Sequence, residues 1–193
     1  MIRKFSIFSK LVRMKTSSAA LFHAYMENFK VGQEECPVCH IKGCCRRYAE
    51  YHRYMLDFTH EKTTTYTLSI VRVKCENCNH THAILPDFIV PYREYSLIFI
   101  LKVLMEYFLH TKPVTALCEK YQITPSMLYR WKTLFFLHHF LWMQCLEDSL
   151  KLYPASFLKE ILCDSCWPNF LSDFFLSFEI SFLQSHANSI ISN

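Results

Sequence analysis

Glycine and long hydrophobic runs are scarce in this sequence. Its 193 residues include two glycines, and neither a P-loop nor a dinucleotide-binding glycine pattern is present. The longest largely apolar stretch without a formal charge is Thr133–Leu146, which contains two histidines and is too short to span a membrane. Serine, histidine and aspartate do not occur in a catalytic order. We therefore expect neither a membrane protein nor an enzyme, and we expect no small-molecule substrate.

The N-terminal region lacks the uninterrupted apolar segment of a secretory signal. Five basic residues interrupt it: Arg3, Lys4, Lys10, Arg13 and Lys15. Ten cysteines are present elsewhere along the chain. Without a secretory signal, so many cysteines favour metal-bound thiolates in a reducing compartment over a disulfide framework. We expect a cytoplasmic protein.

The composition excludes disorder, and the charge is unevenly distributed. Half of the residues are hydrophobic (51%) and 16% are aromatic, so intrinsic disorder and collagen-like repeats are excluded. The net charge is +4, but residues 1–145 are net basic and residues 146–193 are net acidic. The basic part could contact a polyanion such as nucleic acid, while the acidic part would be repelled by one.

Two Cys-x-x-Cys pairs form the strongest motif. They are Cys36 with Cys39, and Cys75 with Cys78. Each pair directs two thiolates at one ion from a tight turn, and two pairs complete a tetrahedral Zn²⁺ shell. Such a closed shell leaves no coordination position for water, so the zinc is expected to be structural. We interpret His40, His80 and His82 as neighbours or surface residues rather than ligands, and Cys44 and Cys45 as loop or core thiols.

The segment between the cysteine pairs is predicted to be a β-hairpin. Residues 47–58 and 63–74 are rich in tyrosine and β-branched residues, and the polar loop His60–Lys62 separates them. Residues 36–91 are therefore expected to form a zinc ribbon that ends in an extended link, Leu85–Pro91. The position after each knuckle usually has a positive φ and is usually glycine. Here His40 and Asn79 occupy these positions, and both residue types tolerate the left-handed region.

Residues 92–150 have a helical period and a break typical of a helix-turn-helix. Leu97, Leu101, Leu104 and Phe108 form one helical stripe. A helix beginning near Pro113 should end at a turn where Gln122 replaces the usual glycine. Thr124-Pro125 is an N-cap followed by proline at the first helical position, and Cys118 is the small residue expected where the two helices cross.

The second helix of this motif would present polar residues to solvent. They are Ser126, Tyr129, Arg130 and Thr133, with Lys132 beside them. In helix-turn-helix proteins the N-terminal part of this helix reaches base edges while flanking groups contact phosphates. Arg130 is the expected base or phosphate contact in double-stranded DNA. The alternative is a helical hairpin used only for packing.

Residues 36–136 resemble the N-terminal region of transposases that pair a four-cysteine zinc ribbon with a helix-turn-helix. The resemblance is carried by CPVC at 36–39, the arginine-containing hairpin, VKCENC at 73–78 with His82, and LYRW at 128–131. The run from CPVC to SMLYRWK also resembles a family of uncharacterised bacterial proteins, mostly from Firmicutes. This second resemblance extends to SFLQSHAN at 181–188. A transposase nuclease needs three carboxylates on a separate domain. Only a short tail follows residue 150, so no nuclease is expected.

The tail, residues 151–193, is predicted to be helical and rich in phenylalanine. Leu171, Phe174, Phe178 and Phe182 recur at helical spacing, and this face should pack on the helical core or, alternatively, form a homodimer contact. Cys163 and Cys166 lack the βαβ setting of a redox dithiol. We interpret them as structural or incidental thiols, with a zinc half-site between subunits as the alternative.

These features predict an α+β protein in which a small four-cysteine zinc ribbon is followed by a mostly helical helix-turn-helix domain. Residues 1–35 would be a basic N-terminal extension. The expected function is zinc-dependent DNA binding, as a regulator or an accessory of a mobile element. Two alternatives remain: a protein-interaction module that uses the ribbon and the tail, and a thiol oxidoreductase centred on Cys163 and Cys166.

Overall fold

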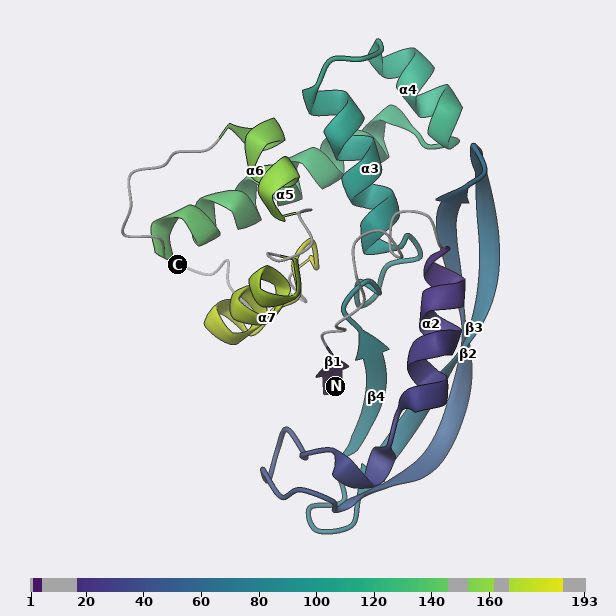
Figure 1. The fold of residues 1–193 in the computed structure, drawn as a ribbon, viewed down its shortest axis with the longest axis vertical. Coiled ribbons are helices and arrows are strands. Elements are labelled where there is room, and N and C mark those ends of the chain that lie inside the picture. Colours follow the sequence, from purple (N-terminus) through teal and green to yellow (C-terminus); the bar gives the residue numbers. More distant parts are fainter. Residues whose placement is uncertain (1, 5–16, 146–152, 162–166, 186–193) are drawn as a thin grey trace.

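The computed structural model describes residues 2–4, 17–145, 153–161 and 167–185, and it has an α+β architecture. Figure 1 shows the strands and α2 on one side of the molecule, with the other helices gathered on the opposite side. The elements are β1 (Ile2–Lys4), α2 (Ser18–Asn28), the 3₁₀ helix η1 (Val31–Gln33), β2 (Cys45–Thr59), β3 (Lys62–Cys75), β4 (Thr81–Pro86), α3 (Leu97–Phe108), α4 (Val114–Tyr121), α5 (Pro125–Cys145), α6 (Pro154–Ile161) and α7 (Trp167–Phe178). None of the helices in the described ranges is long and apolar enough to cross a membrane.

The predicted hairpin is present and slightly longer than expected. Strands β2 and β3 pair antiparallel, and Thr59 lies opposite Lys62. The connection is therefore the dipeptide His60-Glu61, with φ values of 50° and 60°. Two residues with positive φ are typical of a type I′ turn, whose twist matches that of the flanking strands.

The sheet contains two further strands that the sequence did not predict. Its order is β1-β4-β3-β2, with β4 antiparallel to β3 and β1 parallel to β4. The first two residues of the predicted extended link, Leu85 and Pro86, form the end of β4. β2 is consequently an edge strand.

Helix α2 packs on the sheet and was also not predicted. Ser17 caps its N-terminus by accepting a hydrogen bond from the backbone N–H of Ala20. Its buried side chains contact both strands of the hairpin: Ala19, Leu21 and Phe22 pack against Met55, Leu68 and Ile70. The buried Asp57 of β2 accepts hydrogen bonds from the Ser18 N–H at 2.6 Å and from the Ser96 hydroxyl at 3.1 Å. One carboxylate therefore joins the starts of α2 and α3.

The turn between α4 and α5 has the predicted geometry. Gln122 adopts a left-handed conformation with φ 52° at the end of α4. The Thr124 hydroxyl accepts a hydrogen bond from the Met127 N–H at 3.2 Å, and Pro125 is the first residue of α5. Cys118 is buried in the same cluster as Leu128 and Trp131, so the two helices pack closely around this turn.

The C-terminal helices complete the helical core, as the phenylalanine spacing predicted. Leu171, Phe174 and Phe182 are buried in the cluster that contains Phe135 of α5. Residues 146–150 of the predicted helix-turn-helix domain, the Cys163–Cys166 pair and residues 186–188 of the resemblance lie outside the described residues. Residues 5–16, with most of the basic side chains of the N-terminal region, are likewise outside them.

Candidate metal centre and adjoining basic surface

The structure brings the four predicted cysteines together. The sulfurs of Cys36, Cys39, Cys75 and Cys78 all lie within 4.8 Å of one another. The Cys36–Cys78 and Cys39–Cys75 sulfur pairs are each 3.6 Å apart. A tetrahedron with Zn–S bonds of about 2.3 Å requires sulfur separations of about 3.8 Å. The cluster is therefore compatible with one tetrahedral metal ion.

Two turns of the same design build the cluster. The His40 N–H donates to the Cys36 carbonyl at 2.8 Å, and the Asn79 N–H donates to the Cys75 carbonyl at 3.0 Å. His40 and Asn79 have φ values of 58° and 61°, which confirms the predicted left-handed positions. The second turn follows directly from β3, so the hairpin itself delivers Cys75 to the first knuckle.

Hydrogen bonding favours the thiolate at one cysteine of the cluster. The backbone N–H of Cys78 points at the Cys75 sulfur, 3.4 Å away. This contact is the main reason why the pKa of Cys75 falls to about 6. A sulfur that is already ionised at neutral pH binds a cation without first releasing a proton.

The three nearby histidines differ sharply in position. His82 is buried, and its Nε2 lies 3.4 Å from the Cys36 sulfur. Burial lowers the pKa of His82, which favours the neutral ring. A neutral ring with its N–H directed at Cys36 would stabilise the thiolate without binding the metal. His40 and His80 are exposed, as expected for surface residues.

Cys44 lies closer to the cluster than its sequence position suggested. Its sulfur is 3.2 Å from the Cys75 sulfur and donates to the Ile41 carbonyl at 3.0 Å. It does not belong to the group of four whose ligand atoms are mutually close. Burial raises the pKa of Cys44 to about 12, which keeps this thiol protonated and favours a neighbouring role over ligation.

The predicted DNA contacts lie on the exposed side of α5, with one partial exception. Ser126, Tyr129, Arg130 and Thr133 are exposed. Lys132 is half-buried, and its ammonium donates to the Tyr107 hydroxyl at 3.0 Å. The Lys132 charge is therefore already engaged with α3, whereas Arg130 projects from the helix surface.

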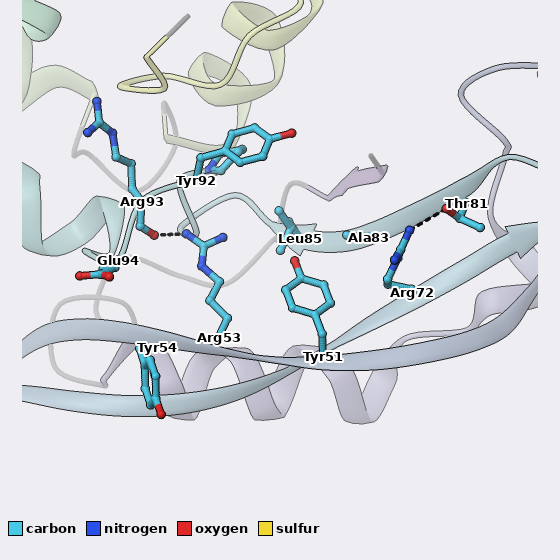
Figure 2. A pocket seen from close by; sticks show the side chains of 11 residues that line it. Tyr51, Arg53, Tyr54, Arg72, Thr81, Ala83, Leu85, Tyr92, Arg93 and Glu94 are labelled. Carbon is cyan, nitrogen blue, oxygen red and sulfur yellow. Dashed lines mark hydrogen bonds between the residues drawn. The ribbon is translucent and has the colours of Figure 1, made fainter. Parts of the chain in front are cut away.

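A hollow beside the sheet was not anticipated from the sequence. It measures about 610 Å³ and lies between β2, β3, β4 and the segment after β4. Its lining includes Tyr51, Arg53, Arg72, Tyr92, Arg93 and Glu94, as Figure 2 shows. Arg93 also lines a second hollow with Arg130 and Thr133 of α5. Because the lining residues are far apart in the sequence, no motif could have revealed the hollow.

Residues 36–131 match one known family model. That family is described as a domain of unknown function, DUF6431. The matched segment begins at the first metal-site cysteine and ends at Trp131 in α5, so it includes both knuckles, the hollow and Arg130. No curated protein and no solved structure matches the chain. The DUF6431 match names neither a bacterial source nor a transposase, so those parts of the resemblance stay predictions.

Proposed function

We propose that this chain is a zinc-dependent DNA-binding protein in which α4 and α5 act as a helix-turn-helix. The observation that carries the proposal is the surface of α5. Ser126, Tyr129, Arg130 and Thr133, chosen from the sequence as DNA contacts, are all exposed within the first three turns of this helix. The same helix begins with a hydroxyl cap and a proline, directly after a left-handed turn residue.

The four thiolates fit a structural zinc ion. Four sulfur ligands in a tetrahedral arrangement favour zinc over magnesium, calcium or manganese, which prefer oxygen. When bound, the metal would cross-link the first knuckle to the end of β3. The chain's own residues hold the hairpin in place relative to α3, because Lys102 donates to the Phe58 carbonyl at 3.3 Å and Asp57 binds Ser96.

Charge around α5 supports contact with a polyanion. The pKa of Arg93 is lowered by burial and by the nearby positive charge of Arg130, so the two guanidinium groups share one region of the surface. Two adjacent cations repel each other in the free protein. A phosphate between them would relieve this repulsion, and arginine binds phosphate oxygens through a two-pronged donor geometry.

A nuclease activity is not part of the proposal. Two-metal nucleases hold their ions with clustered carboxylates. Within the described residues, the cysteine group is the cluster found with metal-ligand geometry. We propose a recognition role, as a regulator or as an accessory of a mobile element.

Selection from a random duplex pool tests this proposal. The purified full chain should enrich a defined sequence, and its affinity for that sequence should fall steeply with salt. Enrichment of no sequence, together with no duplex binding at low salt, would contradict the proposal.

A second candidate is a protein-interaction module. Phe136, Leu137 and Phe140 of α5 are exposed, and Phe140 has 58% of its surface accessible. Exposed apolar groups of this kind on one helix are typical of interaction surfaces. This alternative predicts no duplex binding at physiological salt, and association with a partner or a second copy that Phe140→Ser abolishes.

A further inference from the structure

We propose that the hollow beside the sheet binds an unpaired nucleotide of a nucleic acid strand whose duplex part lies on α5. This inference rests on the proposed function and adds a second subsite to it. Arg93 lines this hollow and also the second hollow, which Arg130 lines. A strand leaving α5 would therefore pass Arg93 before it reached the hollow.

Arg53 shapes the hollow by positioning the segment after β4, whose residues Pro91–Glu94 line the hollow. Its guanidinium donates to the Val90 carbonyl at 2.6 Å and also to the Arg93 carbonyl. The Leu56 N–H donates to the Glu94 carbonyl at 2.7 Å, so the segment is fixed to β2 at several points. Because its Nη2 donates to two carbonyls of this segment and so holds the segment against β2, we assign Arg53 as a positioning residue.

Tyr92 lies in a turn, has a positive φ and is highly exposed. Its φ is 59° and 82% of its surface is exposed. A bulky residue in the left-handed region is strained, and an exposed ring gains little from packing in return. Figure 2 shows Tyr92 on the segment above the hollow and Tyr51 rising from β2 below it. Two rings on opposite sides of one hollow are suited to stacking on a base.

The charges of the hollow favour an anionic ligand. Arg72 is half-buried and donates to the Thr81 hydroxyl at 2.7 Å, which leaves further guanidinium donors for a phosphate. Arg93 extends away from Arg53 in Figure 2, and it also lines the second hollow together with Arg130 of α5. Glu94 is the single carboxylate in the lining, against three arginines. Tyr54 points away from the other lining side chains in Figure 2.

Arginine combined with exposed tyrosine favours an unpaired strand over a second duplex contact. Bases in a duplex are stacked on each other and cannot stack on side chains, whereas single-stranded binding uses aromatic rings with a basic groove. A volume of about 610 Å³ lies within the range of pockets that bind small organic ligands. The hollow is therefore large enough for a nucleotide.

Fluorescence anisotropy with four labelled probes tests this inference on the full chain. The probes are a blunt duplex, the same duplex with a 5′ thymidine tail, the same duplex with a 3′ thymidine tail, and free oligothymidylate. One tailed duplex should bind at least about fivefold more tightly than the blunt duplex, as expected for one stacked base. Tyr92→Ala should remove this gain, and Tyr92→Phe should keep it because the ring is retained.

Tyr48→Ala is the matched control, because Tyr48 is an exposed tyrosine of β2 outside the hollow. It should leave the gain from the tail intact. Arg72→Ala should reduce the gain, whereas Arg130→Ala should weaken binding of the blunt and tailed duplexes by the same factor. Circular dichroism and thermal melting of each variant establish that the fold is retained.

The outcomes separate this inference from the proposed function. No gain from either tail, or equal losses in Tyr92→Ala and Tyr48→Ala, would overturn the nucleotide subsite while leaving duplex binding in place. Oligothymidylate binding that depends on Tyr92, without any duplex binding, would support the subsite and contradict the proposed function. Binding of none of the probes would overturn both.

Discussion

Gln122, His40 and Asn79 adopt the left-handed conformation that glycine adopts most easily, with φ values of 52°, 58° and 61°. Their positions could be predicted from the sequence because a helix end and two metal-binding knuckles require a positive φ there. The chain uses asparagine, histidine and glutamine in these turns, so each turn retains some backbone strain.

Replacing Gln122 with glycine should stabilise the protein. Gln122 is exposed, so its loss removes no buried contact. Release of the left-handed strain should outweigh the greater chain entropy of glycine, with a net gain of about 0.5–1 kcal/mol in the free energy of unfolding. Urea unfolding measures this difference. Glu119→Gly, inside α4, should instead lose about 1 kcal/mol. A loss in Gln122→Gly would contradict the account of this turn.

Glu106 is expected to contribute stability that depends on pH. Burial alone would raise its pKa, but hydrogen bonds from Lys120 and from the Tyr121 hydroxyl at 2.8 Å outweigh burial and lower it. A lowered pKa means that the contribution is complete above the unfolded value of about 4.3 and is lost as the pH falls through the folded value. Glu106→Gln should therefore cost about 1–2 kcal/mol at pH 7.

Urea unfolding of wild type and Glu106→Gln between pH 3 and 8 measures this effect. The difference between them should be constant near neutral pH and should shrink below about pH 4. Glu119→Gln is the control, because Glu119 is exposed on α4, and it should change stability by less than about 0.5 kcal/mol. A stability difference between wild type and Glu106→Gln that grows toward acid pH would contradict the lowered pKa of Glu106.

Among the elements, the hairpin and the α4–α5 pair were predictable, whereas α2 and β4 were not. The hairpin has a strong β-branched pattern, and α5 begins with a recognisable cap and proline. Helix α2 has a weak apolar stripe, and it is stabilised by tertiary contacts of Phe22 and by Asp57 rather than by a local signal. β4 ends in a segment with two prolines, which favoured a link over a strand.

Metal removal should unfold the knuckle end of the sheet first. The chain should bind one zinc ion, and Cys39→Ser or Cys78→Ser should abolish stoichiometric binding, as measured by native mass spectrometry. A chelator removes the metal ion that would cross-link the two knuckles through their four sulfurs. In hydrogen exchange, the amides of the knuckles should therefore be exposed before those of α3.

Cys44→Ser is the control for these variants. Its sulfur is 3.2 Å from that of Cys75 but outside the group of four, so this variant should still bind one zinc ion. Loss of zinc from Cys44→Ser as complete as that from Cys39→Ser would contradict the assignment of the ligands.

On the scale of the whole molecule, the clustering of the four cysteines could be predicted from the sequence, but the surface around them could not. Cys-x-x-Cys spacing is a local signal that leads directly to a site. The hollow combines Tyr51 from β2, Arg72 from β3 and Arg93 from the segment after β4. Residues so far apart come together only through the strand register and through Arg53, which fixes that segment.

The salt dependence of duplex binding tests the central claim most directly. For the selected DNA sequence, Arg130→Ala should weaken binding by about 1–3 kcal/mol, and the slope of log affinity against log salt should fall by about 1 where Arg130 contacts a phosphate. Arg47→Ala, which removes an exposed arginine of β2 outside both hollows, should leave the affinity nearly unchanged. Equal affinities and equal slopes for wild type, Arg130→Ala and Arg47→Ala would contradict the assignment of α5 as the DNA-contacting helix.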